Sequence, residues 1–438
     1  MRGRKWLYRL ALAAIIAGVL GPWATTASSS PPRASTVVML STQFNPVNEA
    51  ETYRSKILNG SPVSVNFVPA DAATFVNRLT AEEQAHHVTV GVMAGLYGDL
   101  EPLAEQGMLQ DLTPLLKKLQ KRGFPKSFLK LSGMGKKGKH YFIPWMQATY
   151  VMAANVKALK YLPKGAKVTS LTYDQLIAWG KNLQKKTGRK LVGLPAGPTS
   201  LIHRFVQGYL YPSYTRTMVT GFRSKNAVKM WQKVRQLWSV TNPQSTNYNF
   251  MQEPLLSGEV WVAWDHVARL INAVQQQPTQ FRLVPSPRGP AGLGYMVVIG
   301  GLAIPKGAPD AKSAQRLIDY LTQPTQQINT LTNLAFFPAT NVKVPVTINT
   351  GTWLESLAVK DQARAKKTIP ALVPVGLGSQ GGAFNKVYID TFRRIAINGE
   401  NIQSVLKDEA PQLQTTLNAS TARCWAPDPP SKGTCHVK

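Results

Sequence analysis

The stretch Gly138-Lys-His-Tyr-Phe-Ile-Pro-Trp-Met-Gln-Ala-Thr-Tyr-Val-Met-Ala-Ala-Asn155 carries three signals that decide the fold. Aromatic and β-branched residues at 141–143 favour a strand, and Pro144 excludes a helix at that point. A second apolar strand is expected over residues 150–153, and Asn155 opens onto a helical segment. We interpret the stretch as a crossing point between two parts of the chain, at which Pro144 turns Trp145 outward.

Upstream of this stretch, expected strands and helices alternate. The strands are expected over residues 37–40, 61–68 and 88–93, with a loop over 94–99 after the third. Asp71 caps an apolar helix, and Gly107 supplies the left-handed residue that ends a helix over 100–106. This alternation predicts an α/β fold with parallel strands and helices on the faces of the sheet.

Downstream, two helix starts are marked by their capping residues. Thr172 and Gln175 form a capping box, because each side chain can bond to the other residue's backbone amide. Ser224 begins a second helix, whose apolar face includes Trp231. We expect Trp231 to be a core residue and not a ligand platform.

The N-terminus has the pattern of a secretory signal over residues 1–27. Four basic residues precede an apolar run over 10–20, which is about half of the roughly 20 apolar residues that a membrane span needs. Residues 28–35 form a Ser/Pro-rich leader, and no cysteine near the cleavage site provides a lipid anchor. We expect an exported protein, periplasmic or at the cell surface; whether the signal is cleaved or acts as an anchor stays open.

The chain is strongly basic. It has 438 residues, with 51 Lys and Arg against 22 Asp and Glu, and a formal net charge of +29. Nucleic acid is not expected as a partner, because the basic residues are spread along the chain and because the secretory signal exports the chain to a compartment without nucleic acid. An acidic habitat, in which surface carboxylates would be protonated, or attraction to anionic polymers and lipid headgroups would each explain the excess.

Cys424 and Cys435 lie in a Pro-rich tail over residues 421–438. In an exported chain, such a pair favours a local disulfide that closes a small loop. The alternatives are a frayed tail with two reduced thiols and a metal site that includes His436. We expect the disulfide.

Several segments resemble family 1 extracellular solute-binding proteins, the maltose- and glycerol-phosphate-type receptors of ABC importers. The matching motifs include Gly138-Lys-His-Tyr-Phe-Ile-Pro144, Leu103-Ala-Glu-Gln-Gly107, Ser257-Gly-Glu-Val-Trp-Val-Ala-Trp-Asp265 and Leu302-Ala-Ile-Pro-Lys-Gly307. Departures from the family pattern are Phe142 in place of a glycine, Ala154 in place of a tyrosine, and the absence of a Pro-Asp dipeptide near residue 90. The resemblance runs from about residue 36 to 418, and order and spacing make it specific.

The resemblance implies a two-lobed, periplasmic-binding-protein-like (type II) fold with a ligand cleft between lobes joined by crossing segments. It also implies a monomer with ABC permease subunits as partners and no catalysis. The expected division is residues 36–150 for the first part of lobe 1, 151–290 for the first part of lobe 2, 291–345 for the return to lobe 1, 346–420 mainly for lobe 2 and the C-terminal helices, and 421–438 for the tail.

Other motifs do not predict a cofactor or a metal. The run 133–140 lacks the hydroxyl residue and the helix of a P-loop, and we interpret it as a basic hairpin turn. The run Gly376-Leu-Gly-Ser-Gln-Gly381 matches a dinucleotide fingerprint, but prolines interrupt the strand before it, so a flexible Gly-rich loop is expected. No nucleophile elbow or HExxH motif occurs, and the adjacent His86 and His87 diverge.

Aromatic, amide and carboxylate side chains gather at expected strand ends and loops. Carbohydrate needs this mixture, because sugar C–H faces stack on aromatic rings while hydroxyls need planar polar groups. The candidate ligand-binding residues are Gln43, Phe44, Tyr97, Asp99, Trp145, Gln147, Tyr150, Trp264, Asp265 and Tyr295. The resemblance directs Trp145 and Trp264 to the cleft, with ordinary burial as the alternative.

We therefore expect a small-molecule receptor that binds a sugar, an oligosaccharide or a polyol phosphate and delivers it to permease subunits. Two alternatives stay open. One is a secreted polysaccharide-active enzyme that uses Asp265 with Glu259 or Glu253 as a carboxylate pair. The other is a surface adhesin held to an anionic polymer by charge.

Overall fold

The computed structural model describes residues 36–438. The expected signal (1–27) and leader (28–35) lie outside the described residues. Across the described part of the chain, no helix combines the length and apolar character needed to cross a membrane.

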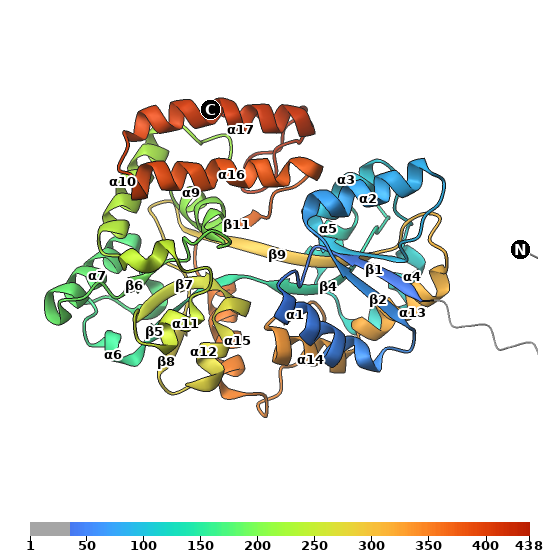
Figure 1. The fold of residues 1–438 in the computed structure, drawn as a ribbon, viewed down its shortest axis with the longest axis horizontal. Helices are drawn as coiled ribbons and strands as arrows, with labels where there is room; N and C mark the ends of the chain where they lie inside the picture. The colour runs from blue at the N-terminus through green and yellow to red at the C-terminus, as the bar shows by residue number, and fades with distance from the viewer. Residues whose placement is uncertain (1–35) are drawn as a thin grey trace, which may run out of the picture. The chain divides into compact units, whose positions relative to one another are not determined.

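The larger of two sheets has the strand order β10-β4-β9-β3-β1-β2, with β11 paired to β9 (Figure 1). Its strands are β1 (Val37–Ser41), β2 (Val65–Pro69), β3 (Val92–Leu96), β4 (Ile143–Ala148), β9 (Leu293–Ala303), β10 (Phe337–Pro338) and β11 (Thr368–Leu372). Strands β1, β2 and β3 are parallel, as their alternation with helices predicts, whereas β9 is antiparallel to β3 and β4. We call this sheet and its helices, apart from β11 and the N-terminal half of β9 that pack against the helices of the other half of the molecule, lobe 1.

The helices of lobe 1 begin where local signals place them. The helices are α1 (Val47–Thr52), α2 (Ala72–Gln84), α3 (Tyr97–Glu105), α4 (Thr113–Lys118), α5 (Lys126–Ser132), α13 (Ala311–Leu321) and α14 (Pro324–Leu334). The Asp71 carboxylate caps α2 by accepting a hydrogen bond from the Thr74 amide at 2.8 Å. Phe75 and Leu79 on α2 are fully buried, so this helix covers one face of the sheet.

The smaller sheet has the order β6-β7-β5-β8. Its strands are β5 (Tyr150–Asn155), β6 (Val192–Gly193), β7 (Val262–His266) and β8 (Phe281–Val284). Its main helices are α7 (Tyr173–Thr187), α10 (Lys225–Ser239), α12 (Ile271–Gln276), α15 (Thr350–Arg364), α16 (Gly381–Phe392) and α17 (Ile402–Ser420). The Thr172 capping box and the Ser224 N-cap both form, and Trp231 is fully buried. We call this sheet and its helices lobe 2.

The predicted crossing point is confirmed. Strand β4 belongs to the larger sheet and β5 to the smaller one, and Thr149 alone separates them. Strand β9 makes a second connection, because its C-terminal half pairs with β3 and β4 while its N-terminal half pairs with β11 (Figure 1). The exact lobe boundaries stay a prediction, although strand membership changes close to residues 150 and 290.

Three local expectations are wrong. Residues 61–64 and 88–91 lie outside the strands, which begin at Val65 and Val92. The expected loop over 94–99 is instead the end of β3 and the start of α3, because the Asp99 carboxylate accepts the Leu96 amide at 3.2 Å and stabilises the first turn. The loop expected over the Gly-rich run is limited to residues 376–377, since a 3-10 turn (Gly378–Gln380) leads directly into α16.

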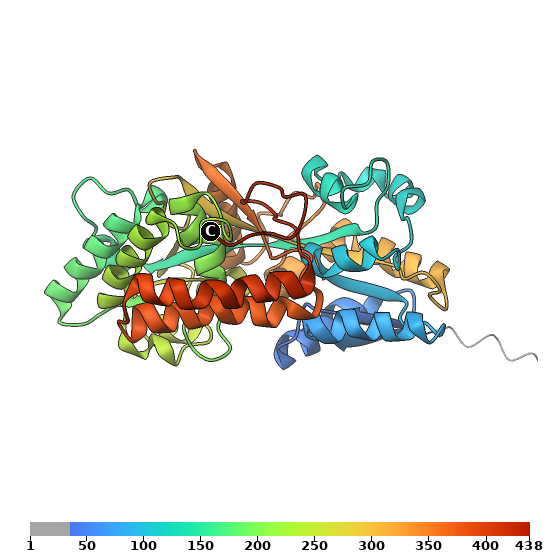
Figure 2. The same ribbon diagram turned by 90° about the horizontal axis from the view of Figure 1, so that it is seen from above.

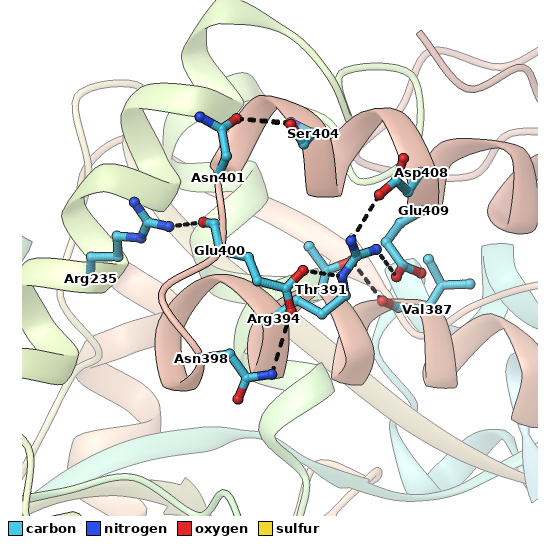
Figure 3. Close-up of polar contacts among 10 residues, drawn as sticks. All are labelled: Arg235, Val387, Thr391, Arg394, Asn398, Glu400, Asn401, Ser404, Asp408 and Glu409. Atoms are coloured by element: carbon cyan, nitrogen blue, oxygen red, sulfur yellow. Dashed lines mark hydrogen bonds and ion pairs between the residues drawn. The ribbon is translucent and has the colours of Figure 1, made fainter.

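Helices α16 and α17 lie side by side in both views (Figure 2). Arg394, just after α16, joins them, because its guanidinium group contacts Glu400 and Asp408 at 2.8 Å and Glu409 at 3.0 Å (Figure 3). These three ion pairs hold the turn between the helices against the first half of α17.

The C-terminal tail is packed and cross-linked. Cys424 and Cys435 form a disulfide bond. Asp428, between them, is buried and accepts hydrogen bonds from the backbone amides of Met218, Val219 and Thr220. The tail is therefore fastened to the segment between α9 (Tyr211–Thr215) and α10.

Candidate functional site

Two adjoining hollows form a cleft between the lobes. The first has a volume of about 230 Å³ and the second about 340 Å³. They share Leu96, Arg204 and Val373. The cleft is therefore one continuous feature with polar groups along it.

Lobe 1 lines the cleft with residues that follow its parallel strands. Thr42 and Gln43 come directly after β1, Leu96 ends β3, and Asp99 lies in the first turn of α3. Glu49 on α1 completes this wall. The site thus lies at the carboxyl ends of β1 and β3, where ligands bind in open α/β sheets.

Lobe 2 contributes Tyr150 at the start of β5 and His266 at the end of β7. It also contributes two arginines, Arg204 on the short helix α8 (Ile202–Phe205) and Arg269 on the 3-10 helix Val267–Arg269. Both lobes therefore supply polar atoms to the same cleft.

Four of the predicted ligand residues line the cleft. Gln43, Phe44 and Tyr150 lie in the first hollow, and Asp99 lies in the second. Phe44 and Tyr150 expose only 2% and 3% of their surfaces, so each ring presents an edge or a single atom to the cleft and not its face.

Neither predicted tryptophan reaches the cleft. Trp145 is fully buried in lobe 1, where its ring meets Phe44 and Tyr53 edge-on at 5.6 and 5.8 Å, so the prediction that Pro144 turns it outward is wrong. Trp264 is 2% exposed and stacks on Tyr150 at 4.9 Å. Each indole therefore lies behind an aromatic residue of the cleft, which it supports.

The remaining predicted residues lie away from the two hollows. Asp265 is fully buried and accepts hydrogen bonds from the amides of His266 at 2.7 Å and Met251 at 3.0 Å. Gln147 donates to the carbonyl of Pro338 at 2.8 Å, which ties β4 to β10. Tyr97 and Tyr295 are half-buried and line neither hollow.

The electrostatics of the cleft involve residues that sequence reasoning missed. Burial raises the pKa of Glu49 to about 7, and Arg269 opposes this rise. Burial also raises the pKa of Asp99, against hydrogen bonds from Thr42 and Leu96 and the charge of Arg204. Burial, reinforced by Arg269, lowers the pKa of His266 to about 3, so the imidazole is neutral.

A weak signal existed for one of these residues. Arg269 follows the strand that contains Asp265, and residues after a strand end are candidates for a site. Arg204 lies in a segment without a motif, so its place in the cleft depends on the tertiary fold. Within residues 36–438, no cluster of three or more His, Cys, Asp or Glu side chains could hold a metal ion.

The chain belongs to a family described as bacterial extracellular solute-binding proteins, which matches residues 50–347. A search of curated protein sequences gives no match.

Solved structures share the fold at low sequence identity. Maltose-bound MalE3 of T. maritima has a TM-score of 0.69 and 16% identity, over 87% of this chain and 100% of that one. UgpB of Mycobacterium tuberculosis in complex with glycerophosphocholine has a TM-score of 0.68 and 17% identity, over 88% and 99%. A sugar transporter protein of Arthrobacter chlorophenolicus with bound laminaribiose has a TM-score of 0.68 and 12% identity, over 87% and 99%. The family and these neighbours are binding proteins, and their fold is the two-lobed one expected from the sequence.

Proposed function

We propose that this chain is the extracytoplasmic solute-binding component of an ABC importer for a sugar, an oligosaccharide or a polyol phosphate. The observation that carries the proposal is the cleft, whose walls come from both lobes and present Gln43, Asp99 and Tyr150. The solutes named for the structural neighbours, maltose, glycerophosphocholine and laminaribiose, belong to the same broad class.

Binding would act through a change in the angle between the lobes. Three connections, at Thr149, along β9 and over residues 339–349 between β10 and α15, provide a hinge about which the lobes close on the solute. The closed form is then the one that the membrane subunits of the importer recognise, with the receptor acting as an exported monomer.

The proposal does not include catalysis. The carboxylate considered for glycoside hydrolysis, Asp265, lines neither hollow, and each of its oxygens accepts a backbone amide. Such a group supports the local backbone and has no approach to a glycosidic oxygen.

Thermal-shift screening with sugars and polyol phosphates tests the proposal. A solute at a hundred times its dissociation constant should raise the free energy of unfolding by about 2.7 kcal/mol. Loss of one hydrogen bond in Gln43→Ala should weaken binding by roughly 3- to 10-fold, whereas Gln147→Ala should leave affinity unchanged because Gln147 lies outside the cleft. Equal effects of the two variants, or no binding of any solute, would count against the proposal.

Salt dependence separates this function from adhesion to an anionic polymer. Binding in the cleft should change little with ionic strength for a neutral sugar and moderately for a solute with one anionic group, whereas attachment through many surface charges should fall steeply. Isothermal titration at low and high salt makes this comparison.

A further inference from the structure

Two arginines of lobe 2 enter the cleft without an acidic partner. Arg204 and Arg269 both line the first hollow, and neither is among the ion pairs formed within residues 36–438. A guanidinium group withdrawn from water is stabilised when a planar oxyanion accepts two of its hydrogen bonds. The first hollow therefore offers two donors that suit an anion.

Both guanidinium groups are held in place by neighbours that leave donors free. Arg269 lies over the Phe250 ring at 4.5 Å and donates to the Asn249 carbonyl at 3.3 Å. Arg204 donates to Gln207 at 3.1 Å, and Gln207 in turn donates to Asn385 at 3.1 Å. Because the two side chains are already positioned, less side-chain entropy is lost when a ligand binds to them, and they are therefore suited to binding.

The opposite wall carries carboxyl groups. Glu49 and Asp99 belong to lobe 1, and neither lies within ion-pair distance of an arginine in the described structure. Each nevertheless senses one charge across the cleft, Arg269 for Glu49 and Arg204 for Asp99. The two walls thus differ in chemistry, with guanidinium donors of lobe 2 opposite carboxyl groups of lobe 1 and no ion pair between them.

A solute that fits this gap must satisfy both walls. Hydroxyl groups of the solute can donate hydrogen bonds to the carboxyl groups of lobe 1, because carboxyl oxygens are acceptors. An anionic group can accept from the two arginines of lobe 2. A neutral sugar would leave both guanidinium groups desolvated without an anion, which is costly.

We propose that the cleft selects a small polyhydroxylated solute with one anionic group, a phosphate or a carboxylate, bound by Arg204 and Arg269 while Glu49 and Asp99 accept its hydroxyl groups. This inference rests on the proposed receptor function and narrows its substrate class. Arg204 and Arg269 are then the residues that determine specificity for charge.

A matched set of six-carbon probes tests the inference: neutral sorbitol, gluconate and sorbitol 6-phosphate, with maltose as a neutral disaccharide. Calorimetry on the full chain should give tighter binding of one or both anions than of sorbitol. Preference for gluconate or for the phosphate identifies which anionic group the site takes.

Variants locate the anion contact. Arg204→Gln and Arg269→Gln should each weaken anion binding by about 10- to 100-fold, the range for a charged hydrogen bond. Arg282→Gln removes the same charge from an exposed position on β8 and should have no effect. Arg269→Lys retains the charge and should lose less affinity than Arg269→Gln, which distinguishes anion binding from misfolding.

The outcomes separate the two proposals. Tight binding of maltose or sorbitol that survives both Arg→Gln substitutions would overturn the anion inference and leave the receptor function standing. Failure of both anionic probes while a neutral sugar binds would also overturn the anion inference alone, whereas failure of the whole panel of sugars and polyol phosphates would overturn both.

Discussion

The hydroxyl group of Tyr209 should be essential to the connection between the lobes. It accepts a hydrogen bond from the Tyr150 amide at 3.1 Å and lies 3.0 Å from the Thr149 hydroxyl and 3.2 Å from the Tyr150 carbonyl. Thr149 and Tyr150 are the residues at which the chain passes from one sheet to the other. Tyr209 therefore fixes the backbone at the crossing point.

The substitution Tyr209→Phe isolates this contribution. The phenylalanine ring retains the edge-on contacts with Trp264 at 5.2 Å and Tyr150 at 5.8 Å, so no large cavity forms. The Tyr150 amide, however, loses its acceptor in a fully buried position. An unsatisfied buried donor costs about 1–3 kcal/mol, which is the expected loss of unfolding free energy.

Urea unfolding followed by circular dichroism measures this loss. Tyr161→Phe is the control, because this half-exposed tyrosine has no hydrogen bond from its hydroxyl among those formed in the described residues, and it should change stability by less than about 0.5 kcal/mol. A loss for Tyr209→Phe no larger than that of the control would refute the role assigned to the hydroxyl group.

Two further predictions concern charge. Arg394→Met should lower the free energy of unfolding by about 2–4 kcal/mol, because Glu409 would stay largely buried without its partner and two exposed ion pairs would also be lost. Urea unfolding measures this loss, with Lys386→Met as the control that removes one exposed ion pair. A loss below about 0.5 kcal/mol for Arg394→Met would contradict the prediction. Stability should also rise as the pH falls from about 7.5 to 5. Burial raises the pKa of Glu49 and Asp265 to about 7, so the folded chain binds protons in this window that the unfolded chain does not. Two neutral buried histidines, His203 and His266, oppose the effect. They are outnumbered, because burial also raises the pKa of Asp99, Glu101 and Glu355. A melting temperature that falls on acidification would show that the histidines prevail.

Much of the fold could be predicted because its signals are local. Asp71, Thr172 and Ser224 cap helices through their own side chains, and the capping bond involves residues three positions away. The crossing point was also predictable, since Pro144 excludes a helix and the two apolar runs beside it favour strands. These features depend on the sequence within a few residues.

The cleft was harder to predict because burial is a tertiary property. Pro144 restricts the backbone, but the direction of Trp145 depends on β4, which has β9 on one side and β10 on the other and is covered by Phe44 and Tyr53. The expected stacking of sugar on indole rings thus has no basis in the structure. The receptor assignment now depends on the family match and on the predicted residues that do line the cleft, Gln43, Asp99 and Tyr150, without the two tryptophans.

The arginines were missed for a related reason. Arg204 and Arg269 are 65 positions apart and come together only through the packing of lobe 2. In a chain with 51 basic residues, the position of Arg269 shortly after a strand is only a weak signal, and Arg204 has none. The high net charge of the chain therefore made it difficult to tell from the sequence which basic residues line the cleft.

The stacking of Trp264 on Tyr150 has a practical consequence for spectroscopy. Tyr150 borders the cleft, and the indole behind it lies nearly parallel, with an angle of 5° between the rings. A solute that shifts Tyr150 would alter the surroundings of this indole, whose emission depends on local polarity and quenching. The chain thus contains its own fluorophore beside the cleft, and occupancy can be followed without attaching a dye.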